Sequence, residues 1–398
     1  MIEGFYFRFY QLTNWKALSI VLAFLARFFF FLLFQIKRAF LKKESILIDE
    51  KDSLSILECT SPDPAKVPDY TTADLDPAID LSIIVPIYNH LDVLEECIES
   101  LLHQNTRFRY ELILVDDGST DGAQSFIEQY RSRDNLVLIH QANGGIAAAR
   151  NTGISHAKGR YLMFADCDDS VKDSLVETLV AAAVSADSDI AMCGHNLVKK
   201  KEGVVTSILP NVHPGVNLLG YRNGDEIMNY AGLPWAKVYK RELFEKVRFF
   251  PGYWYEDTIV HSLLFTQCEV FRYIPVALYD YNWYEGNFTH VQSSRQAKPK
   301  AVDRYWLIKA ICDNYDRIGL PHNAMFYTML LKHVSAYYYP SFSSLPKEVV
   351  QAMFLAGREL LLNYRPDERV RLPYMLRLTE RAILKNDIAL WKLCSVNQ

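Results

Sequence analysis

The sequence lacks the cysteine and histidine patterns of a structural metal site or of a disulfide framework. Its seven cysteines are dispersed, no two of them form a Cys-x-x-Cys pair, and no histidine cluster has the spacing of a zinc finger. These absences argue against structural zinc. An odd number of scattered cysteines in a long chain is typical of buried thiols in a reducing compartment, which favours a cytosolic catalytic portion.

The chain also lacks a large charge excess, internal repeats and heptad arrays. Its formal net charge is −4, which gives no electrostatic basis for nucleic-acid binding. Half of the 398 residues are hydrophobic, with many Tyr and Phe, and this composition argues against disorder over most of the length. A chain of this size can bury more than one core, and we expect one main domain with attachments.

Residues 15–43 have the most unusual composition, an apolar run with few polar positions. Its central part, residues 18–36, is close to the roughly 20 residues that a spanning helix needs, but Arg27 lies in the middle and is costly in a bilayer. Two interpretations stay open: a tilted span with Arg27 paired or snorkelling, and an interfacial helix among the headgroups. A core helix is a third, which four consecutive phenylalanines at residues 28–31 disfavour.

Basic residues follow the apolar run, at Lys37, Arg38, Lys42 and Lys43. They outnumber Arg8 and Lys16 before it, so a spanning helix would leave the bulk of the chain in the cytoplasm. No small-residue cleavage site follows the run, and a removable signal peptide therefore fits poorly. We predict a membrane-associated chain with its catalytic domain in the cytoplasm.

Proline and aspartate are frequent within residues 44–78, which predicts a linker after the N-terminal segment 1–43. Short apolar runs then alternate with helical patterns. Strands are expected at residues 81–89, 112–115, 135–141, 161–165 and 189–194, and helices at 92–103, 126–130, 146–157 and 174–186. The alternation predicts an α/β fold with a mostly parallel sheet and helices on both faces. Residues 292–398 carry apolar stripes at helical spacing and are expected to form a helical C-terminal region.

Two of these strands end in acidic residues. Asp116 and Asp117 follow the second strand, and Asp166 and Asp168 follow the fourth. Since ligands of such sheets bind beyond the carboxyl ends of the strands, we expect these acids in one pocket. Asp166 and Asp168 lie two residues apart in an extended strand end, so they project to the same side. Together they can hold Mg²⁺ or Mn²⁺ with substrate phosphates.

A solvated turn or a helix cap is the alternative for this acidic cluster. Asp169 or Ser170 would cap the helix that follows. We favour capping for these two residues and metal binding for Asp166 and Asp168. Asp121 is likewise expected to cap the next helix.

Four segments resemble, in order and spacing, the successive blocks of the family 2 glycosyltransferases with a GT-A fold. They are LSIIVPIYNHLDVLEECIESLLHQ, ELILVDDGSTDG, NGGIAAARNTGISHAKGRYLMFADCDD and LPWAKVYKRELFEKVRFFPGYWYED. A lone Asp-x-Asp is weak evidence, but four blocks in register are highly specific. The resemblance covers residues 81–289. It implies a GT-A domain over residues 79–291 that transfers a sugar from a nucleoside diphosphate to an acceptor hydroxyl with inversion.

The resemblance implies that two loops bind the nucleotide. The residues that match its base-binding positions are Pro86, Tyr88, Asn89, Asp116 and Asp117. Tyr88 would stack on the base, with ordinary packing as the alternative, and Asp117 would accept the imide N–H of a uracil. Uridine is the default nucleotide, so the implied donor is a UDP-sugar.

The third block matches the stretch that lies under ribose and diphosphate. Gly144 and Gly145 would permit close backbone approach, and Arg150 would add charge or, equally, brace the acidic strand ends through ion pairs. Asp168 matches the direct metal ligand, and Asp166 matches a ribose or second metal contact. The implied Mn²⁺ or Mg²⁺ stabilises the charge that develops on the diphosphate as the glycosidic bond breaks.

The acceptor hydroxyl must lose its proton as it attacks, so a general base has to face the anomeric carbon. Glu256 and Asp257 in the fourth block match this position, and we choose Asp257 as the base. The alternative is that both acids complement a helix dipole, a use worth about 0.3 to 1 kcal/mol. Trp235 and Lys237 match the acceptor side, where Trp235 is equally a core candidate.

The sequence after the fourth block matches a closing strand and a flexible stretch that folds over the donor, with Thr289 and His290 as candidate phosphate contacts. No Gln-x-x-Arg-Trp motif and no later apolar spans are present, which favours transfer of a single sugar to a glycan or lipid-linked acceptor. The C-terminal helices would brace the catalytic domain, contact membrane beside residues 337–339 or form an oligomer, and simple helix packing is the default.

Two other classes compete with glycosyl transfer. A phosphoryl-transfer enzyme would use the cluster at residues 166–169 as nucleophile and acid. That arrangement usually follows the first strand of its sheet, and it leaves the VDDGSTD and WYED segments unexplained. An inactive membrane-attached scaffold would have lost motif residues, and we find none missing.

Overall fold

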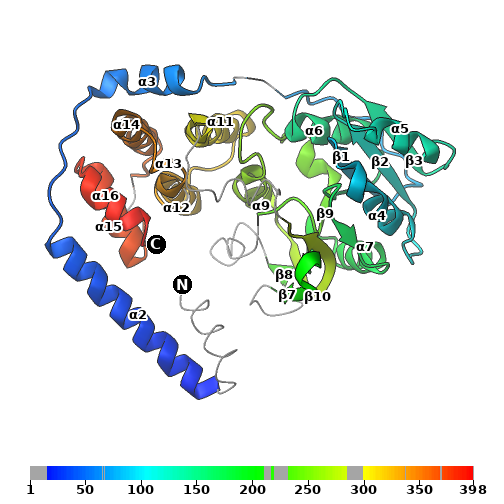
Figure 1. Cartoon of the computed structure of the whole chain (residues 1–398), viewed down its shortest axis with the longest axis horizontal. Coiled ribbons are helices and arrows are strands. Elements are labelled where there is room, and N and C mark those ends of the chain that lie inside the picture. The colour runs from blue at the N-terminus through cyan, green and yellow to red at the C-terminus, as the bar shows by residue number, and fades with distance from the viewer. Residues whose placement is uncertain are drawn as a thin grey trace. The chain divides into compact units, whose positions relative to one another are not determined.

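The structure is a computed structural model that describes residues 16–64, 66, 68–209, 217–218, 232–284, 299–336, 338–367 and 370–397 (Figure 1). The chain divides into two compact units. One comprises Met1–Pro62, Gln296–Ile308 and His322–Gln398, and the other comprises Asp63–Arg295 and Lys309–Pro321. We call the first the helical unit and the second the sheet unit, after their main elements.

The sheet unit is built on one sheet with the strand order β3-β2-β1-β4-β9-β6-β10-β5, in which β7 pairs with β6 and β8 with β10. The strands are β1 Leu81–Ile87, β2 Tyr110–Asp116, β3 Leu136–His140, β4 Tyr161–Phe164, β5 Ser170–Val171, β6 Ile190–Lys199, β7 Val204–Ile208, β8 Asn217–Leu218, β9 Lys237–Lys240 and β10 Phe271–Asn282. Every strand predicted from the alternation is present, and the bounds differ by a few residues.

The direction of the strands differs between the two halves of the sheet. Strands β3, β2, β1 and β4 are parallel to one another, as predicted. Strand β9 is antiparallel to both β4 and β6, so the sheet as a whole is mixed and not mostly parallel. The alternation could not show this because a parallel pair needs a crossover helix between its strands, whereas a reversed strand does not.

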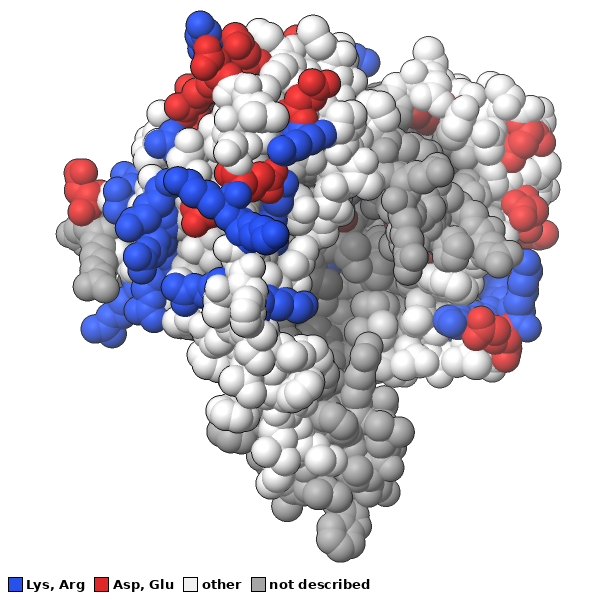
Figure 2. Space-filling view, turned by 60° about the vertical axis from the view of Figure 1, so that its left-hand side comes forward, with Lys and Arg blue, Asp and Glu red and all other residues white. Residues whose placement is uncertain are grey.

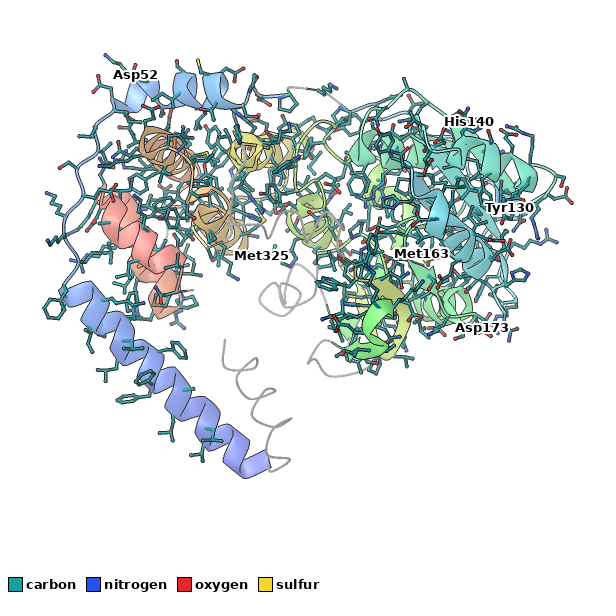
Figure 3. All side chains as sticks on the ribbon, viewed as in Figure 1. Asp52, Tyr130, His140, Met163, Asp173 and Met325 are labelled. Atoms are coloured by element: carbon teal, nitrogen blue, oxygen red, sulfur yellow. The ribbon has the colours of Figure 1, made fainter. Side chains whose placement is uncertain are left out.

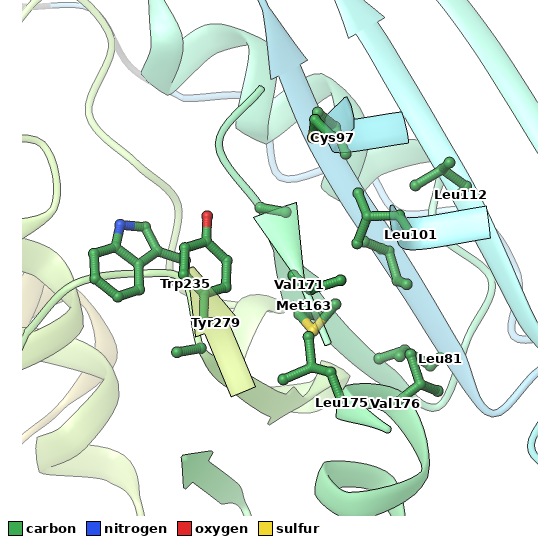
Figure 4. Packing of buried hydrophobic residues seen from close by; sticks show 14 of the residues in the cluster. Leu81, Cys97, Leu101, Leu112, Met163, Val171, Leu175, Val176, Trp235 and Tyr279 are labelled. Atoms are coloured by element: carbon green, nitrogen blue, oxygen red, sulfur yellow. The ribbon is translucent and has the colours of Figure 1, made fainter. Parts of the chain in front are cut away.

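Helices cover both faces of the parallel half, as predicted. They are α4 Leu91–Leu102, α5 Ala123–Ile127, α6 Ile146–His156 and α7 Leu175–Ala186. Side chains of α4, α5 and α7 share a core with the strands, and Figure 4 shows Leu101 of α4 and Leu175 of α7 beside Leu81 and Met163. Burial of one such side chain stabilises the fold by about 1.5 to 3 kcal/mol.

Helix α6 lies directly against the other face of the sheet. Alternate residues of β1 enter the core formed with α4 and α7, and Ile84 between them points to α6 because successive side chains of a strand face opposite sides. A Cβ atom at Gly153 of α6 would collide with the Ile84 side chain. The absence of a side chain at residue 153 therefore sets how closely α6 approaches β1.

The chain between β9 and β10 contains short helical elements. They are the 3-10 turn η4 Arg241–Phe244, the π-helix η5 Val260–Leu264 and α9 Phe265–Gln267. A π-helix is rare and is often found at functional sites. Here it begins three residues after Asp257.

The helical unit confirms that the C-terminal region is helical. Its elements are α2 Lys16–Ala39, η1 Glu50–Asp52, α3 Ser53–Thr60, η6 Pro299–Val302, α12 Ala324–His333, α13 Tyr339–Phe342, α14 Lys347–Asn363, α15 Tyr374–Leu384 and α16 Ile388–Ser395, and helix α11 Asp303–Ile318 begins in it. The segment predicted as a linker contains η1 and α3, and Gln351 of α14 bonds to the backbone of Ser45 and Leu47.

Trp391 of α16 occupies the core of the helical unit, where its indole N–H donates to the carbonyl of Val334. A membrane contact beside residues 337–339 was one of the predicted roles. Tyr338 is fully buried and therefore packs inside the unit. Tyr337 lies outside the described residues. All seven cysteines are free thiols and six of them are buried, as the sequence predicted.

Helix α2 holds the apolar run of the sequence. Phe34 packs with Leu378 of α15 and Cys394 of α16, whereas the phenylalanines at residues 28–31 are exposed, and Figure 3 shows the side chains of α2 standing out from its ribbon. Within the described residues, no helix has the length and apolar character needed to cross a bilayer.

Candidate active site

One buried arginine joins two acidic segments that lie far apart in the sequence. Arg150 of α6 is 2% exposed; its Nη2 atom donates to Oδ1 of Asp166 at 2.9 Å and its Nη1 atom donates to Oε1 of Glu256 at 2.7 Å. Burial opposes the positive charge, but the two carboxylates outweigh it and hold the pKa of Arg150 above its usual value. The third and fourth blocks therefore converge. Of the two roles predicted for Arg150, the structure shows the one in which it holds acidic side chains through ion pairs.

Asp169 fastens the acidic turn to strand β10. Its carboxylate is buried and accepts hydrogen bonds from the Tyr279 hydroxyl at 2.8 Å and the Asn282 N–H at 2.9 Å. Ser174 occupies the N-cap position of α7, and Ser170 begins β5. The capping prediction for Asp169 and Ser170 is therefore wrong, because β10 lies beside the turn and offers Asp169 two buried donors.

Asp168 and Asp166 are the other carboxylates of this turn. Oδ2 of Asp168 accepts from the Tyr284 hydroxyl at 2.9 Å. Burial and the neighbouring Asp166 carboxylate raise the pKa of Asp168, and burial with both neighbours raises the pKa of Asp169 well above its usual value. Of the three carboxylates of the turn, Asp166 pairs with the Arg150 guanidinium, so the turn carries an excess of negative charge.

This donor set fits a hard divalent cation. Mg²⁺ and Mn²⁺ accept one or two carboxylates and complete their coordination with water and substrate phosphates. The described residues contain no cluster of three or more metal-ligating side chains. Asp168 and Asp166 would therefore hold such an ion only together with a diphosphate, because the two carboxylates do not complete its coordination alone.

Asp117 organises the glycine loop that precedes α6. Its carboxylate accepts from the side-chain amide of Gln141 at 2.6 Å and from the N–H groups of Gly144 and Gly145 at 2.9 and 2.8 Å. Asp116 beside it accepts from the Ser119 N–H at 3.0 Å. The geometry brings the second and third blocks together, and the assignment of Asp117 to a uracil stays a prediction.

His140, labelled in Figure 3, lies at the end of β3, and both of its ring nitrogens have hydrogen-bond partners. Its ring nitrogens lie 3.2 Å from Oδ2 of Asp116 and 2.8 Å from Oε1 of Glu128.

Asp121, predicted to be a helix cap, accepts from the backbone N–H groups of Leu91 at 2.8 Å and Ala123 at 3.0 Å. The N-cap positions of α4 and α5 are held by His90 and Gly122, and the Asp121 carboxylate instead bonds the first N–H group of each helix.

The loop after β1 presents an aromatic ring to solvent. Tyr88 is 48% exposed, as a stacking platform for a base requires. Asn89 joins this loop to the one after β2, since its Oδ1 accepts from the Thr120 N–H at 2.9 Å and its N–H donates to the Ser119 hydroxyl at 2.8 Å. Pro86 is buried inside β1, so it shapes the end of the strand and does not offer a contact surface.

Trp235 and Lys237, which the resemblance put on the acceptor side, are both buried. Trp235 stacks on Tyr279 with ring centroids 4.6 Å apart. Nζ of Lys237 donates to the carbonyl of Leu233 at 2.6 Å, and burial lowers the pKa of Lys237 to about 7. Neither side chain reaches a surface, so we interpret both as supports of the site.

Glu256 and Asp257 lie at a strained part of the backbone. Tyr255, immediately before them, has a φ angle of 66°. Positive φ angles also occur beside other candidate site residues, at Asn89, His90 and Ala236. Such conformations cost of the order of 1 to 3 kcal/mol each and cluster at functional sites.

Some site residues were not identified from the sequence. Tyr279 and Tyr284 contact the acidic turn through their hydroxyl groups, but their only signal was membership of the aromatic ALYDYNWYEG segment. Thr289 and His290 lie outside the described residues.

A sheet that brings an exposed tyrosine, a glycine loop and an acidic turn to the ends of β1, β3 and β4 is the arrangement of a GT-A glycosyltransferase. Known proteins agree. The profile of glycosyl transferase family 2 matches residues 82–248. The chain is 33% identical over 254 residues to the uncharacterized glycosyltransferase EpsJ of Bacillus subtilis, an alignment that covers 58% of this chain and 72% of EpsJ. The chain belongs to glycosyltransferase family 2.

Two further relatives show how far the similarity extends. The chain is 30% identical over 266 residues to the glycosyltransferase GlyA of Streptococcus pneumoniae, which covers 65% of this chain but only 36% of GlyA. The crystal structure of S. aureus TarS 1–349 in complex with UDP-GlcNAc has a TM-score of 0.61 at 22% identity and covers 80% of this chain and 90% of that one. The latter similarity shows a shared fold.

Proposed function

We propose that this chain is an inverting glycosyltransferase that moves one sugar from a UDP-sugar to a hydroxyl of a glycan or lipid-linked acceptor. The observation that carries the proposal is the contact of Arg150 with both Asp166 and Glu256. It brings the acidic turn and the segment with the candidate base into one site. The TarS structure was determined with UDP-GlcNAc, which favours a uridine nucleotide here.

The donor would lie across the ends of β1, β2 and β4. Tyr88 stacks on the base, and the loop held by Asp117 lies under the ribose and diphosphate. A Mg²⁺ or Mn²⁺ ion held by Asp168 and Asp166 would stabilise the negative charge of the departing diphosphate. Arg150 keeps Asp166 in position and leaves this carboxylate one further oxygen for a ligand.

Asp257 is the better of the two candidate bases. Glu256 is held by Arg150 at 2.7 Å and would have to give up a buried ion pair in order to accept a proton. Asp257 is the next residue and is partly buried. Its carboxylate takes the proton of the acceptor hydroxyl as the oxygen attacks the anomeric carbon from the side opposite the diphosphate, and inversion follows.

We also propose that α2 contacts a membrane and that the sheet unit works in the cytoplasm. The exposed phenylalanines at residues 28–31 support this, because a contiguous exposed apolar patch marks an interaction surface. The basic residues Lys37, Arg38, Lys42 and Lys43 follow them in the sequence. They favour the cytoplasmic leaflet.

A donor screen tests the proposed reaction. Purified protein is incubated with a panel of nucleotide sugars and Mn²⁺, and hydrolysis or transfer is measured. We expect a UDP-sugar to be used, Asp168→Ala to lose metal-dependent nucleotide binding, and Asp257→Ala to lose turnover but keep that binding. Asp173→Ala, an exposed aspartate close to the acidic turn, is the control. Indifference of the wild-type protein to every nucleotide sugar and to chelators would refute the proposal.

A further inference from the structure

Helix α2 is exposed on all sides along one turn. The four phenylalanines at residues 28–31 are between 45% and 59% exposed. Successive residues of an α-helix point about 100° apart, so four consecutive half-exposed residues leave every side of this turn at least partly open. This part of the helical unit therefore offers a contiguous apolar surface to a partner.

Helix α15 meets α2 at Tyr374. The Tyr374 ring lies 5.7 Å from the ring of Phe31. Its hydroxyl accepts from Nε2 of Gln35 at 3.1 Å and from Nη1 of Arg38 at 3.4 Å. The first turn of α15 is thus fixed beside the exposed part of α2.

Helix α15 carries a row of positive charges that starts at this contact. Tyr374, Arg377, Arg381 and Lys385 are exposed, and their spacing puts them along one side of the helix. We call Arg377, Arg381 and Lys385 the cationic stripe. No carboxylate of the described residues is within ion-pair distance of the stripe. Figure 2 shows lysine and arginine side chains gathered on one part of the surface.

Arg377 also borders a cavity of about 1120 Å³ whose charged lining residues are Arg365, Arg371 and the carboxylates Asp367 and Glu380. The Tyr327 hydroxyl donates to Glu380 at 2.9 Å, so Glu380 already has a partner. Three arginines thus line the cavity with two acids, and guanidinium groups bind phosphate oxygens in a bidentate manner. A lipid headgroup phosphate next to the apolar α2 would find donors there.

We propose that α2 and α15 form one docking surface for an anionic lipid bilayer, in which the phenylalanines of α2 enter the headgroup region and the cationic stripe with Arg371 binds lipid phosphates. This inference rests on the membrane contact proposed for α2 and gives the C-terminal helices a role in it. A second copy of the chain is a poorer partner, because a symmetric contact would bring stripe against stripe. Charge complementarity favours the bilayer.

Vesicle flotation with the full chain tests the docking surface. The vesicles contain phosphatidylcholine alone or phosphatidylcholine with phosphatidylglycerol. We expect the wild-type protein to prefer the anionic vesicles and Arg377→Gln/Arg381→Gln/Lys385→Gln to bind them about 100-fold more weakly, since each basic residue at an anionic surface contributes roughly a fivefold change. Binding of the triple variant to neutral vesicles should stay as in the wild type.

Two further variants keep the outcomes distinct. Arg133→Gln/Lys201→Gln/Lys246→Gln removes the same charge from exposed residues of the sheet unit and should bind like the wild type. Phe28→Ser/Phe29→Ser should lose binding to both kinds of vesicle. If the wild-type protein binds no vesicle, or sediments as a dimer that the phenylalanine variant dissociates, the membrane contact itself is wrong. If the wild-type protein binds vesicles and the Arg377→Gln/Arg381→Gln/Lys385→Gln variant binds them equally well, only the role of α15 is wrong. The donor screen tests the proposed reaction independently of both results.

Discussion

Nη1 of Arg150 lies 2.7 Å from Oε1 of Glu256, although 106 positions separate the two residues in the chain. The same guanidinium contacts Asp166 at 2.9 Å. Removal of one partner from a buried ion pair leaves a charge without compensation, which costs more than the pair itself contributes. The stability of the sheet unit and the geometry of its site therefore depend on the same side chain.

Arg150→Met should lower the free energy of unfolding by about 3 kcal/mol, because it leaves Asp166 and Glu256 without their partner. Urea denaturation measures the change. Addition of Glu256→Gln to this variant should restore part of the loss, since it removes one of the two unpaired charges. A wild-type unfolding midpoint in Arg150→Met would contradict the role of the brace.

Asp168 and Asp169 should respond differently to the same substitution. Asp169→Ala deprives Tyr279 and Asn282 of a buried acceptor and should cost about 1 to 3 kcal/mol of stability for each lost bond. Asp168→Ala should leave stability almost unchanged and abolish metal-dependent nucleotide binding. Thermal denaturation and titration calorimetry with UDP and Mn²⁺ separate the two effects. Equal behaviour of both variants would refute the division of roles.

Asp257→Asn should lower kcat by about 10² to 10⁴, the usual contribution of a general base, and leave the KM for the donor unchanged. Glu256→Gln should instead reduce stability, because it removes a partner of Arg150. Steady-state kinetics with the donor and acceptor found in the screen measure the first effect. If Glu256→Gln loses kcat and Asp257→Asn does not, the base is Glu256.

Asp117→Asn should loosen the glycine loop, because an amide nitrogen would face the N–H groups of Gly144 or Gly145 where a carboxylate oxygen now accepts. We expect the affinity for UDP to fall several-fold to tenfold, because a partly buried N–H group of the loop would lose its acceptor, and a fully buried one would cost about 1 to 3 kcal/mol. Calorimetry with UDP and CDP tells the loop effect from recognition of the uracil. Loss of UDP affinity alone would assign Asp117 to the base, and equal losses would assign it to the loop.

Lys237 should make stability depend on pH. Burial lowers its pKa to about 7 from the ordinary value of 10.5. Between these values the unfolded chain binds one proton more than the folded chain, so stability should rise with pH by up to about 1.4 kcal/mol per unit. Lys237→Met should lose this contribution to the slope in urea denaturation at several pH values above 7. Identical slopes in both proteins would show that Lys237 does not titrate in this range.

The parallel half of the sheet and its helices could be predicted because they depend on local patterns. The apolar run at β1 and the stripe formed by Leu94, Cys97, Ile98 and Leu101 in α4 are buried where the spacing required. The meeting of the acids after β2 and β4 with the residues of the fourth block could not be read from spacing alone. Its prediction required either the rule that ligands bind beyond the carboxyl ends of parallel strands or the resemblance of the four segments to the family 2 glycosyltransferases.

The errors concern partners that come from β9 and β10. Asp169 was assigned to a helix cap because its neighbours in sequence form a helix, but its donors, Tyr279 and Asn282, lie more than a hundred residues away. Lys237 was assigned to the acceptor side, but β9 runs antiparallel between β4 and β6 and carries it inside. Trp235, two residues before β9, is also buried, which agrees with the core alternative that the sequence left open for it. Non-local pairing of this kind leaves no periodic signal in the sequence.

Gly153 has a consequence for the chemistry although it carries no functional group. It lies one turn after Arg150 on α6 and allows that helix to rest on Ile84. A methyl group at residue 153 would lift the helix and draw the guanidinium away from both carboxylates at once. Larger residues at position 153 would therefore change the catalytic rate only by changing the distance between α6 and the sheet. A series of such variants would lower the rate stepwise while every polar residue of the site is retained.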